Sequence, residues 1–318
     1  MWYIHRVNSQ PKLGIVIAAY NAERFLMKTL ESIRDTTHRN FECVVVNDGS
    51  TDSTYTIADS FATADDRFTV VTITNSGPCI ARNIGFDYLG EEVSYIVFTD
   101  ADDVIFPDTY SRFIDNLEHD QECIAVHGLG TFIDEHDQVD KSGTFERIGL
   151  ARKKLHIGRI VDLGTDQPTS FESLVLSSTV FPPGLVVHRK EILDKAGLFD
   201  TESRYAEDWD LLLRVTRFGH MSFVPEPVLY YRRHQNNVGT SPRVPVACKK
   251  VWTKAYYSKE NSASHREFLK SAFRAKNISE LQLYVNNVIG PKRDQNRPRA
   301  MRGILGSLVR LIQCKPQR

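Results

Sequence analysis

The chain has 318 residues, and its 40 basic and 40 acidic side chains cancel at neutral pH. This balance excludes the strong positive field that is typical of nucleic-acid-binding proteins, so no nucleic acid is expected as a partner. The composition, with 41% hydrophobic and 25% charged residues, is that of a globular protein, and no apolar run approaches the roughly 20 residues of a membrane span. The N-terminal segment lacks the apolar core of a signal peptide, which predicts a cytoplasmic protein.

The N-terminal third alternates between apolar strands and amphipathic helices. Strands are predicted at residues 13–19, 41–48, 68–73 and 94–99, and helices at 23–35, 51–62 and 77–89. Strands separated by helices of this length indicate an α/β fold with a mainly parallel open sheet that is covered by helices on both faces.

The pattern changes after residue 120. We predict a strand or hairpin at 123–134, a polar insertion at 135–169, a strand at 181–189, helices at 190–197 and 206–219, and an extended segment at 221–234. From about residue 246 the chain is helical and more basic. We therefore predict a main domain over residues 1–245 and a helical, basic C-terminal extension over residues 246–318.

Polar turns follow four of the predicted strands directly. They are AAYN (18–21), NDGS (47–50), NSGP (75–78) and DADD (100–103). In open sheets of this kind, ligands bind beyond the carboxyl ends of the strands, so the four turns should share one rim.

The fourth turn concentrates the carboxylates of Asp100, Asp102 and Asp103, which repel one another and gain nothing from burial. Such a cluster suits a hard divalent cation, Mg²⁺ or Mn²⁺, that bridges to a diphosphate. Two alternatives remain open at this point. The first two acids also match the nucleophile motif of haloacid-dehalogenase-type phosphatases, and the aspartates could simply cap a helix that starts near Asp108.

Other polar residues near this rim allow a functional and a structural interpretation. Asp48 could accept a hydrogen bond from a base or ribose, or cap the next helix. Tyr20 could stack on a nucleobase or pack in the core, and Arg82 could bind phosphate or lie on the surface. Glu207 and Asp208 begin a helix, whose dipole stabilises acids with or without a catalytic role.

Five segments considered together are more specific than any one of them. IVIAAYNAERFLMKTLESI, FECVVVNDGSTDST, GPCIARNIG, YIVFTDADDVIFPD and GLFDTESRYAEDWDLLLRV occur in this order, and they closely resemble family 2 glycosyltransferases of the GT-A fold over about residues 12–235. One departure is Ala18, which stands where the family usually has proline. The haloacid-dehalogenase interpretation is weaker, because its nucleophile should follow the first strand rather than the fourth.

The resemblance implies a role for each matching residue. The nucleotide and donor site would comprise Ala18, Ala19, Tyr20, Asp48, Arg82, Asp100, Ala101 and Asp102. The metal, Mn²⁺ or Mg²⁺, would be bound by Asp102 and His234. Asp208 would be the catalytic base, with Glu207 orienting its neighbours, and Gly184 and Trp209 would lie at the acceptor or sugar pocket.

The implied reaction transfers a sugar, with inversion, from a nucleotide-diphosphate donor to an acceptor hydroxyl. UDP is the usual nucleotide of the family, and the acceptor would be a carbohydrate or a lipid-linked glycan in surface polysaccharide or glycoconjugate synthesis. An alternative is a nucleotide-sugar-binding module without turnover, which a donor-hydrolysis assay would distinguish.

Two features outside these motifs carry further expectations. Five scattered cysteines without a CxxC pair are poor evidence for disulfides or zinc and favour a reducing compartment. Residues 291–318 combine eight basic residues and one acid with an apolar helical pattern. This tail could lie on anionic lipid at the inner face of the membrane, but we prefer docking on the catalytic domain or self-association.

Overall fold

The computed structural model describes residues 10–140, 155–156, 160–161, 167–176, 180, 182–235, 237 and 241–273. Its first part follows the predicted alternation, with strands β1 (Lys12–Ala19), β2 (Phe41–Asp48), β3 (Phe68–Ile73) and β4 (Val93–Asp100). The helices between them are α1 (Leu26–Arg34), α2 (Thr54–Ala64) and α3 (Pro78–Asp87). The predicted strands and helices of this part are therefore confirmed, with small shifts at their ends.

The remaining elements build the second half of the sheet and its cover. The strands are β5 (Val104–Ile105), β6 (Cys123–Ile133), β9 (Val186–Arg189) and β10 (His220–Arg232), and a separate pair joins β7 (Leu155–His156) to β8 (Ile160–Val161). The helices are α4 (Thr109–His119), α6 (Phe171–Leu176), α7 (Lys190–Ala196), α8 (Glu207–Val215) and α9 (Val244–Tyr257), followed by helical residues 263–273. Two short 3₁₀ turns, η1 (Pro183–Leu185) and η2 (Thr201–Ser203), precede β9 and α8.

Eight strands form one sheet in the order β3-β2-β1-β4-β9-β6-β10-β5. Strands β1, β2, β3 and β4 pair in parallel, as do β6 and β10, whereas β9 runs antiparallel to both of its neighbours. The chain adds β2 and β3 on one side of β1 and β4 on the other. Such a reversal opens a crevice at the carboxyl ends of the strands, which here is the end of β1 and β4.

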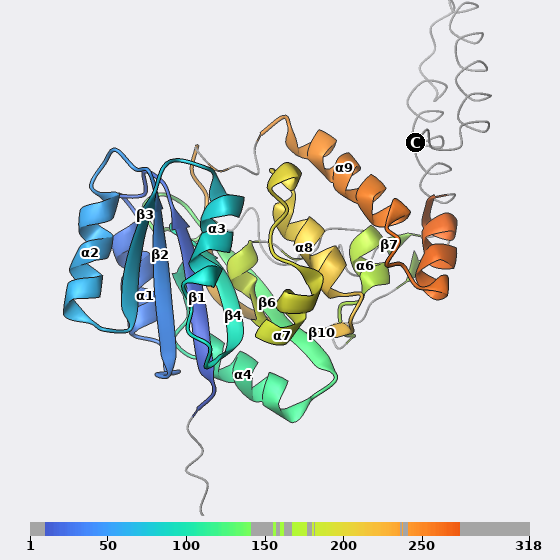
Figure 1. Ribbon diagram of the computed structural model, residues 1–318, viewed down its shortest axis with the longest axis horizontal. Helices are drawn as coiled ribbons and strands as arrows, with labels where there is room; N and C mark the ends of the chain where they lie inside the picture. Colours follow the sequence, from blue (N-terminus) through green and yellow to red (C-terminus); the bar gives the residue numbers. More distant parts are fainter. Residues whose placement is uncertain are drawn as a thin grey trace, which may run out of the picture.

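Helices cover both faces of the sheet (Figure 1). Val44 and Val46 of β2 point to one face and pack with Ala81 of α3, while the alternate residues of the strand join the main core on the other face. On α3, a Cβ added at Gly85 would overlap the side chain of Val16 in β1. The helix therefore lies unusually close to the sheet, and this approach fixes the position of Arg82 one turn earlier.

Helix α9 packs against α8 and its surroundings (Figure 1). Val251 and Ala255 are buried, and the indole N–H of Trp252 donates to the carbonyl of Val175 at 3.2 Å. Because α9 begins at Val244, the predicted boundary at 245/246 falls inside this helix, and the proposed division into two domains stays a prediction. The tail at 291–318 lies outside the described residues. No helix among those described is long and apolar enough to cross a membrane.

Candidate active site

A cavity of about 800 Å³ opens at the carboxyl ends of β1 and β4, beside the start of α8. Ten of the predicted site residues line it: Ala18, Tyr20, Arg82, Asp100, Ala101, Asp102, Glu207, Asp208, Trp209 and His234. Ala19, Asp48 and Gly184 lie nearby but not in its lining. The strand-end turns and the distant Glu-Asp pair of α8 therefore meet at one cavity.

The acidic turn after β4 is the most concentrated negative charge in this lining. Carboxylate oxygens of Asp100, Asp102 and Asp103 lie within 4.8 Å of one another, and Nε2 of His234 lies 2.8 Å from Oδ2 of Asp102. Asp103 is fully buried and accepts a hydrogen bond from the N–H of Arg232 at 3.1 Å. Its Oδ2 has no hydrogen-bond partner among the described residues.

This arrangement disfavours the ionised form of two of the three acids. Burial, and then the charges of Asp102 and Asp100, raise the pKa of Asp103 well above its usual value. Burial also raises the pKa of Asp100, where the attraction of Arg82 and the repulsion of Asp102 act in opposite directions. A bound cation would reverse both shifts, because it favours the charged form of every carboxylate around it.

Arg232 binds the acidic turn through its backbone and its side chain. Its buried guanidinium is held by structural partners: Nε donates to the carbonyl of Asp102 at 2.9 Å, and Nη1 pairs with Asp137 at 2.5 Å. Arg233, in contrast, is exposed and pairs with Asp140. The chain thus uses Arg232 to position the turn.

Arg82 links the acidic turn to α8. Its buried guanidinium donates to Asp100 at 2.6 Å through Nη2 and to Glu207 at 3.3 Å through Nη1, and it lies 5.1 Å from the ring of Phe199. Burial opposes the positive charge, but the two carboxylates outweigh it and raise the pKa of Arg82. This cation therefore holds the strand end and the helix start in one arrangement.

Asp208 differs from its neighbour because it has no cationic partner within ion-pair distance among the described residues. Burial, followed by the negative charge of Glu207, raises the pKa of Asp208 to about 7. Its Oδ1 accepts the N–H of Trp209 at 2.8 Å, and the helix is preceded by Ala206 without a side-chain cap. A carboxylate that titrates near neutrality is suited to accept a proton.

The turns after β1 and β2 brace each other. Oδ1 of Asn21 accepts the N–H of Thr51 at 2.9 Å, and the N–H of Asn21 donates to Ser50 at 3.0 Å. Tyr20 projects from this brace with 53% of its surface exposed, so its ring is free to stack against a planar ligand.

Asp48 has structural contacts that the sequence did not reveal. Its carboxylate accepts the N–H groups of Ser76 at 2.6 Å and Gly77 at 2.8 Å, and it is buried. Gly77 has φ of 89°, a conformation that favours glycine, directly before α3. Asp48 thus fixes the turn that starts the helix of Arg82, and its contact with a base stays a prediction.

The two residues predicted for the acceptor pocket lie mainly in packed surroundings. The indole N–H of Trp209 donates to the carbonyl of Leu174 at 2.9 Å, while part of the ring reaches the cavity. Gly184 lies in η1, where an added Cβ would stand 3.3 Å from Leu229 and 3.7 Å from the backbone of Thr99. Its neighbours Pro182 and Pro183 line the cavity instead.

Sequence reasoning missed several lining residues. Tyr205 has φ of 79°, which is a strained conformation for a tyrosine, and its hydroxyl accepts a hydrogen bond from Arg243 at 3.0 Å. Val244 and Cys248 reach the cavity from α9. Only the position of Tyr205 beside the Glu-Asp pair could have drawn attention to it, whereas nothing in the sequence indicates that α9 returns to the site.

The fold is similar to that of solved structures determined in complex with nucleotide sugars. S. aureus TarS 1–349 in complex with UDP-GlcNAc is 15% identical, with 95% of this chain and 81% of that chain covered, at a TM-score of 0.64. The mannosyltransferase PcManGT of Pyrobaculum calidifontis, in complex with GDP-Man and Mn²⁺, is 16% identical, with 97% and 82% covered, at a TM-score of 0.53. The fold is the GT-A fold of glycosyltransferases.

Residues 14–167, just under half of the chain, match the family model described as glycosyl transferase family 2. An uncharacterized glycosyltransferase of Haemophilus influenzae is 24% identical over 72% of this chain and 68% of its own length. The putative glycosyltransferase EpsH of Bacillus subtilis is 27% identical over 72% of this chain and 62% of its own length. The matched segment is thus about two thirds of these relatives.

Proposed function

We propose that this protein is an inverting, metal-dependent glycosyltransferase that moves a sugar from a nucleotide-diphosphate donor, preferably a UDP-sugar, to an acceptor hydroxyl. The observation that carries the proposal is that the acidic turn and the carboxyl group of Asp208, with its raised pKa, line the same cavity. The structures with the same fold that hold UDP-GlcNAc or GDP-Man agree with a donor of this class.

The acidic turn suits a divalent cation. Its donors are carboxylate oxygens, which Mg²⁺ and Mn²⁺ prefer, and the buried Oδ2 of Asp103 lacks a partner among the described residues. Asp102 and His234 would hold the ion, since they already lie 2.8 Å apart at the cavity. When bound, the cation would offset the negative charge that develops on the departing diphosphate.

Residues of the chain would make the remaining contacts with the donor nucleotide. The exposed ring of Tyr20 would stack on the base, and Ala18 and Ala101, which line the cavity, would leave room for the nucleotide. Ala19 is buried in the core beside this pocket, and its contact with the nucleotide stays a prediction. Asp100, which is fixed by Arg82, would face the ribose. Asp48 would contribute through the turn that it braces before α3.

Asp208 would accept the proton of the acceptor hydroxyl as that oxygen attacks the anomeric carbon and the bond to the diphosphate breaks. Glu207 is engaged by Arg82, so its charge orients the site and keeps the affinity of Asp208 for a proton high. Of the acids among the described lining residues, Asp100 and Glu207 pair with Arg82 and Asp102 pairs with His234. This leaves Asp208 as the base and favours a single displacement, which inverts the anomeric configuration.

The acceptor would enter on the side of α8, where Trp209 and the η1 segment around Gly184 shape the wall. A carbohydrate or a lipid-linked glycan fits this open cavity, in the synthesis of surface polysaccharide or glycoconjugate. The basic tail at 291–318 would then dock on the protein, self-associate or contact the inner face of the membrane.

A thermal-shift screen of nucleotide sugars with and without Mn²⁺ tests the proposal. Because a ligand that binds only the native state stabilises it, one donor should raise the melting temperature in a metal-dependent manner. Hydrolysis of that donor would then separate an enzyme from a silent binding module. No stabilisation by any nucleotide sugar would contradict the proposal.

A further inference from the structure

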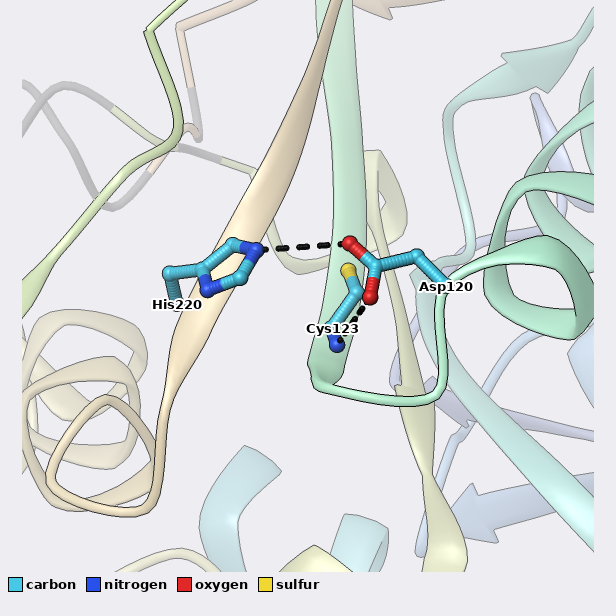
Figure 2. A group of neighbouring side chains, drawn as sticks. All are labelled: Asp120, Cys123 and His220. Carbon is cyan, nitrogen blue, oxygen red and sulfur yellow. Dashed lines mark hydrogen bonds and ion pairs between the residues drawn. The ribbon is translucent and has the colours of Figure 1, made fainter.

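A second group of potential metal ligands lies at the amino ends of two strands, at the opposite end of the sheet from the carboxyl ends that form the candidate active site. Asp120 directly follows α4, Cys123 begins β6 and His220 begins β10. In the parallel pairing of these two strands, Cys123 and His220 are direct register partners. Figure 2 shows the imidazole reaching across from β10 to the carboxylate of Asp120, with the sulfur of Cys123 beside that carboxylate.

The ligand atoms are close enough to share one ion. An imidazole nitrogen, a carboxylate oxygen and the sulfur all lie within 4.8 Å of one another, and Nε2 of His220 is 3.5 Å from Oδ2 of Asp120. Ligands of tetrahedral zinc, at about 2.0–2.3 Å from the ion, stand roughly 3–4 Å apart. A small side-chain adjustment therefore completes the geometry.

The surroundings of each ligand favour this use. Oδ1 of Asp120 accepts the N–H groups of Glu122 at 3.0 Å and Cys123 at 3.2 Å, which fixes the carboxylate and leaves Oδ2 facing His220. The N–H of Ser222 donates to the sulfur of Cys123 at 3.3 Å, and the hydroxyl oxygen of the same serine accepts from the thiol at 3.3 Å. Once the thiol has lost its proton, this hydroxyl can donate to the sulfur as well, and such donors stabilise a thiolate ligand.

Charge and exposure also agree with a bound divalent ion. A thiolate, a carboxylate and a neutral imidazole together neutralise the two positive charges. The Cys123 side chain is buried, whereas those of His220 and Asp120 are 36% and 45% exposed, so an ion would enter from the solvent side. In the metal-free protein the thiol donates to the carbonyl of Ala125 at 2.9 Å, and metal binding would release this proton.

We propose that Asp120, Cys123 and His220 bind a zinc ion, with water in the fourth position. The sulfur ligand distinguishes this site from the all-oxygen turn after β4, which suits Mg²⁺ or Mn²⁺. The ion would connect the end of α4 to the start of β10, at the amino ends of the strands and away from the cavity. It would therefore stabilise the fold and take no part in the sugar transfer.

Cobalt titration of the reduced, chelator-treated full-length protein, in excess Mg²⁺, tests this proposal. A Co²⁺–thiolate charge-transfer band should appear at one equivalent and disappear when Zn²⁺ is added. Cys123→Ser should abolish the band. The matched control is Cys248→Ser, because Cys248 lines the candidate active site and should leave the band unchanged.

A second pair of variants keeps the test valid if Cys123→Ser does not fold. His220→Ala changes a partly exposed side chain and should weaken zinc affinity by at least about tenfold. His119→Ala removes an exposed histidine next to Asp120 and should not. A band that survives Cys123→Ser, no band in the wild type, or equal zinc affinities of the two histidine variants would each overturn the proposal.

Discussion

Asp208 combines a position in the first turn of α8 with a pKa raised to about 7. Asp208→Asn keeps the size of the side chain but cannot accept a proton, so turnover should fall by about 10²–10⁴, the usual contribution of general-base catalysis. Donor affinity should barely change, because in the proposed function the acidic turn, and not Asp208, would hold the diphosphate end. Steady-state kinetics and donor titration on one preparation measure both quantities.

Asp210 provides the matched control on the same helix. It is buried and pairs with Arg214 at 3.0 Å and with Lys254 at 2.8 Å. Asp210→Asn should therefore lower the melting temperature while the folded protein keeps most of its turnover. If Asp208→Asn turned over like the wild type, Asp208 would not be the base.

The raised pKa of Asp208 also predicts a dependence on pH. The value of kcat/KM should rise with pH to a midpoint near 7, as the free enzyme loses the proton from this carboxyl group. Between its ordinary pKa and about 7, the native state keeps this proton and the unfolded chain does not, so the group destabilises the native state as pH rises.

Chemical denaturation of both proteins at several pH values checks this sign. Asp208→Asn should gain stability relative to the wild type between pH 5 and pH 8, since the variant has no carboxyl group to ionise there. Parallel stability curves, together with a flat kcat/KM profile, would show that Asp208 is ionised throughout this range.

Helix α3 connects packing to the site, because Gly85 allows its close approach to β1 and Arg82 lies one turn before it. Gly85→Ala would place a methyl group against Val16 and should destabilise the protein by about 1–3 kcal/mol. It should also weaken donor binding, because Arg82 moves with the helix. Urea denaturation and nucleotide titration measure the two effects.

Gly90→Ala is the control for this packing argument. A Cβ at Gly90 would stand 3.4 Å from the carboxylate of Glu42, which is close to an ordinary contact, so stability and donor affinity should change little. Equal effects of the two substitutions would mean that the close approach of α3 does not position Arg82.

The strands and helices of the first half were predictable because their signals are local. β2 is an apolar run followed by a polar turn, and α1 repeats buried residues at helical spacing. Helix from about residue 246 was also predicted, and α9 begins at Val244. The packing of α9 against α8 was not predictable, because contacts between distant segments leave no periodic signal in one sequence.

Some residues of the candidate active site were predictable from local sequence, and others are revealed only by the fold. Asp100 and Asp102 were predictable because the end of a strand in a parallel sheet places them at the rim. The ion pairs of Arg82 with Asp100 and Glu207 join residues that are far apart in the chain, so only the fold reveals them. The strained Tyr205 carries no local signal, since tyrosine rarely adopts positive φ.

For the whole chain, the contacts of α9 predict that the catalytic unit extends past residue 245. Truncation after residue 243 removes the buried Val251 and the ion pairs of Lys254, and it should yield unstable protein. Truncation after residue 290 should keep the melting temperature and turnover on a soluble acceptor. Expression, thermal melts and kinetics of the two truncations compare these outcomes.

A comparison of the full-length protein with the protein truncated after residue 290 addresses the basic tail. If its eight basic residues contact lipid, the protein without residues 291–318 should sediment less with anionic liposomes than the full-length chain. If the full-length protein does not sediment with such liposomes, docking of the tail on the catalytic domain or self-association would be favoured.

For the truncation after residue 243, a stable and active protein would contradict a catalytic unit that extends past residue 245.

The central claim is that the acidic turn after β4 binds a nucleotide diphosphate through a cation, and calorimetric titration of UDP with and without Mn²⁺ tests it most directly. Wild-type protein should bind UDP in a metal-dependent manner, and Asp102→Ala should lose that dependence while remaining folded. Asp108→Ala, which removes an exposed acid that makes no cap hydrogen bond at the start of α4, should bind like the wild type. Unchanged affinity and metal dependence in Asp102→Ala would contradict the claim.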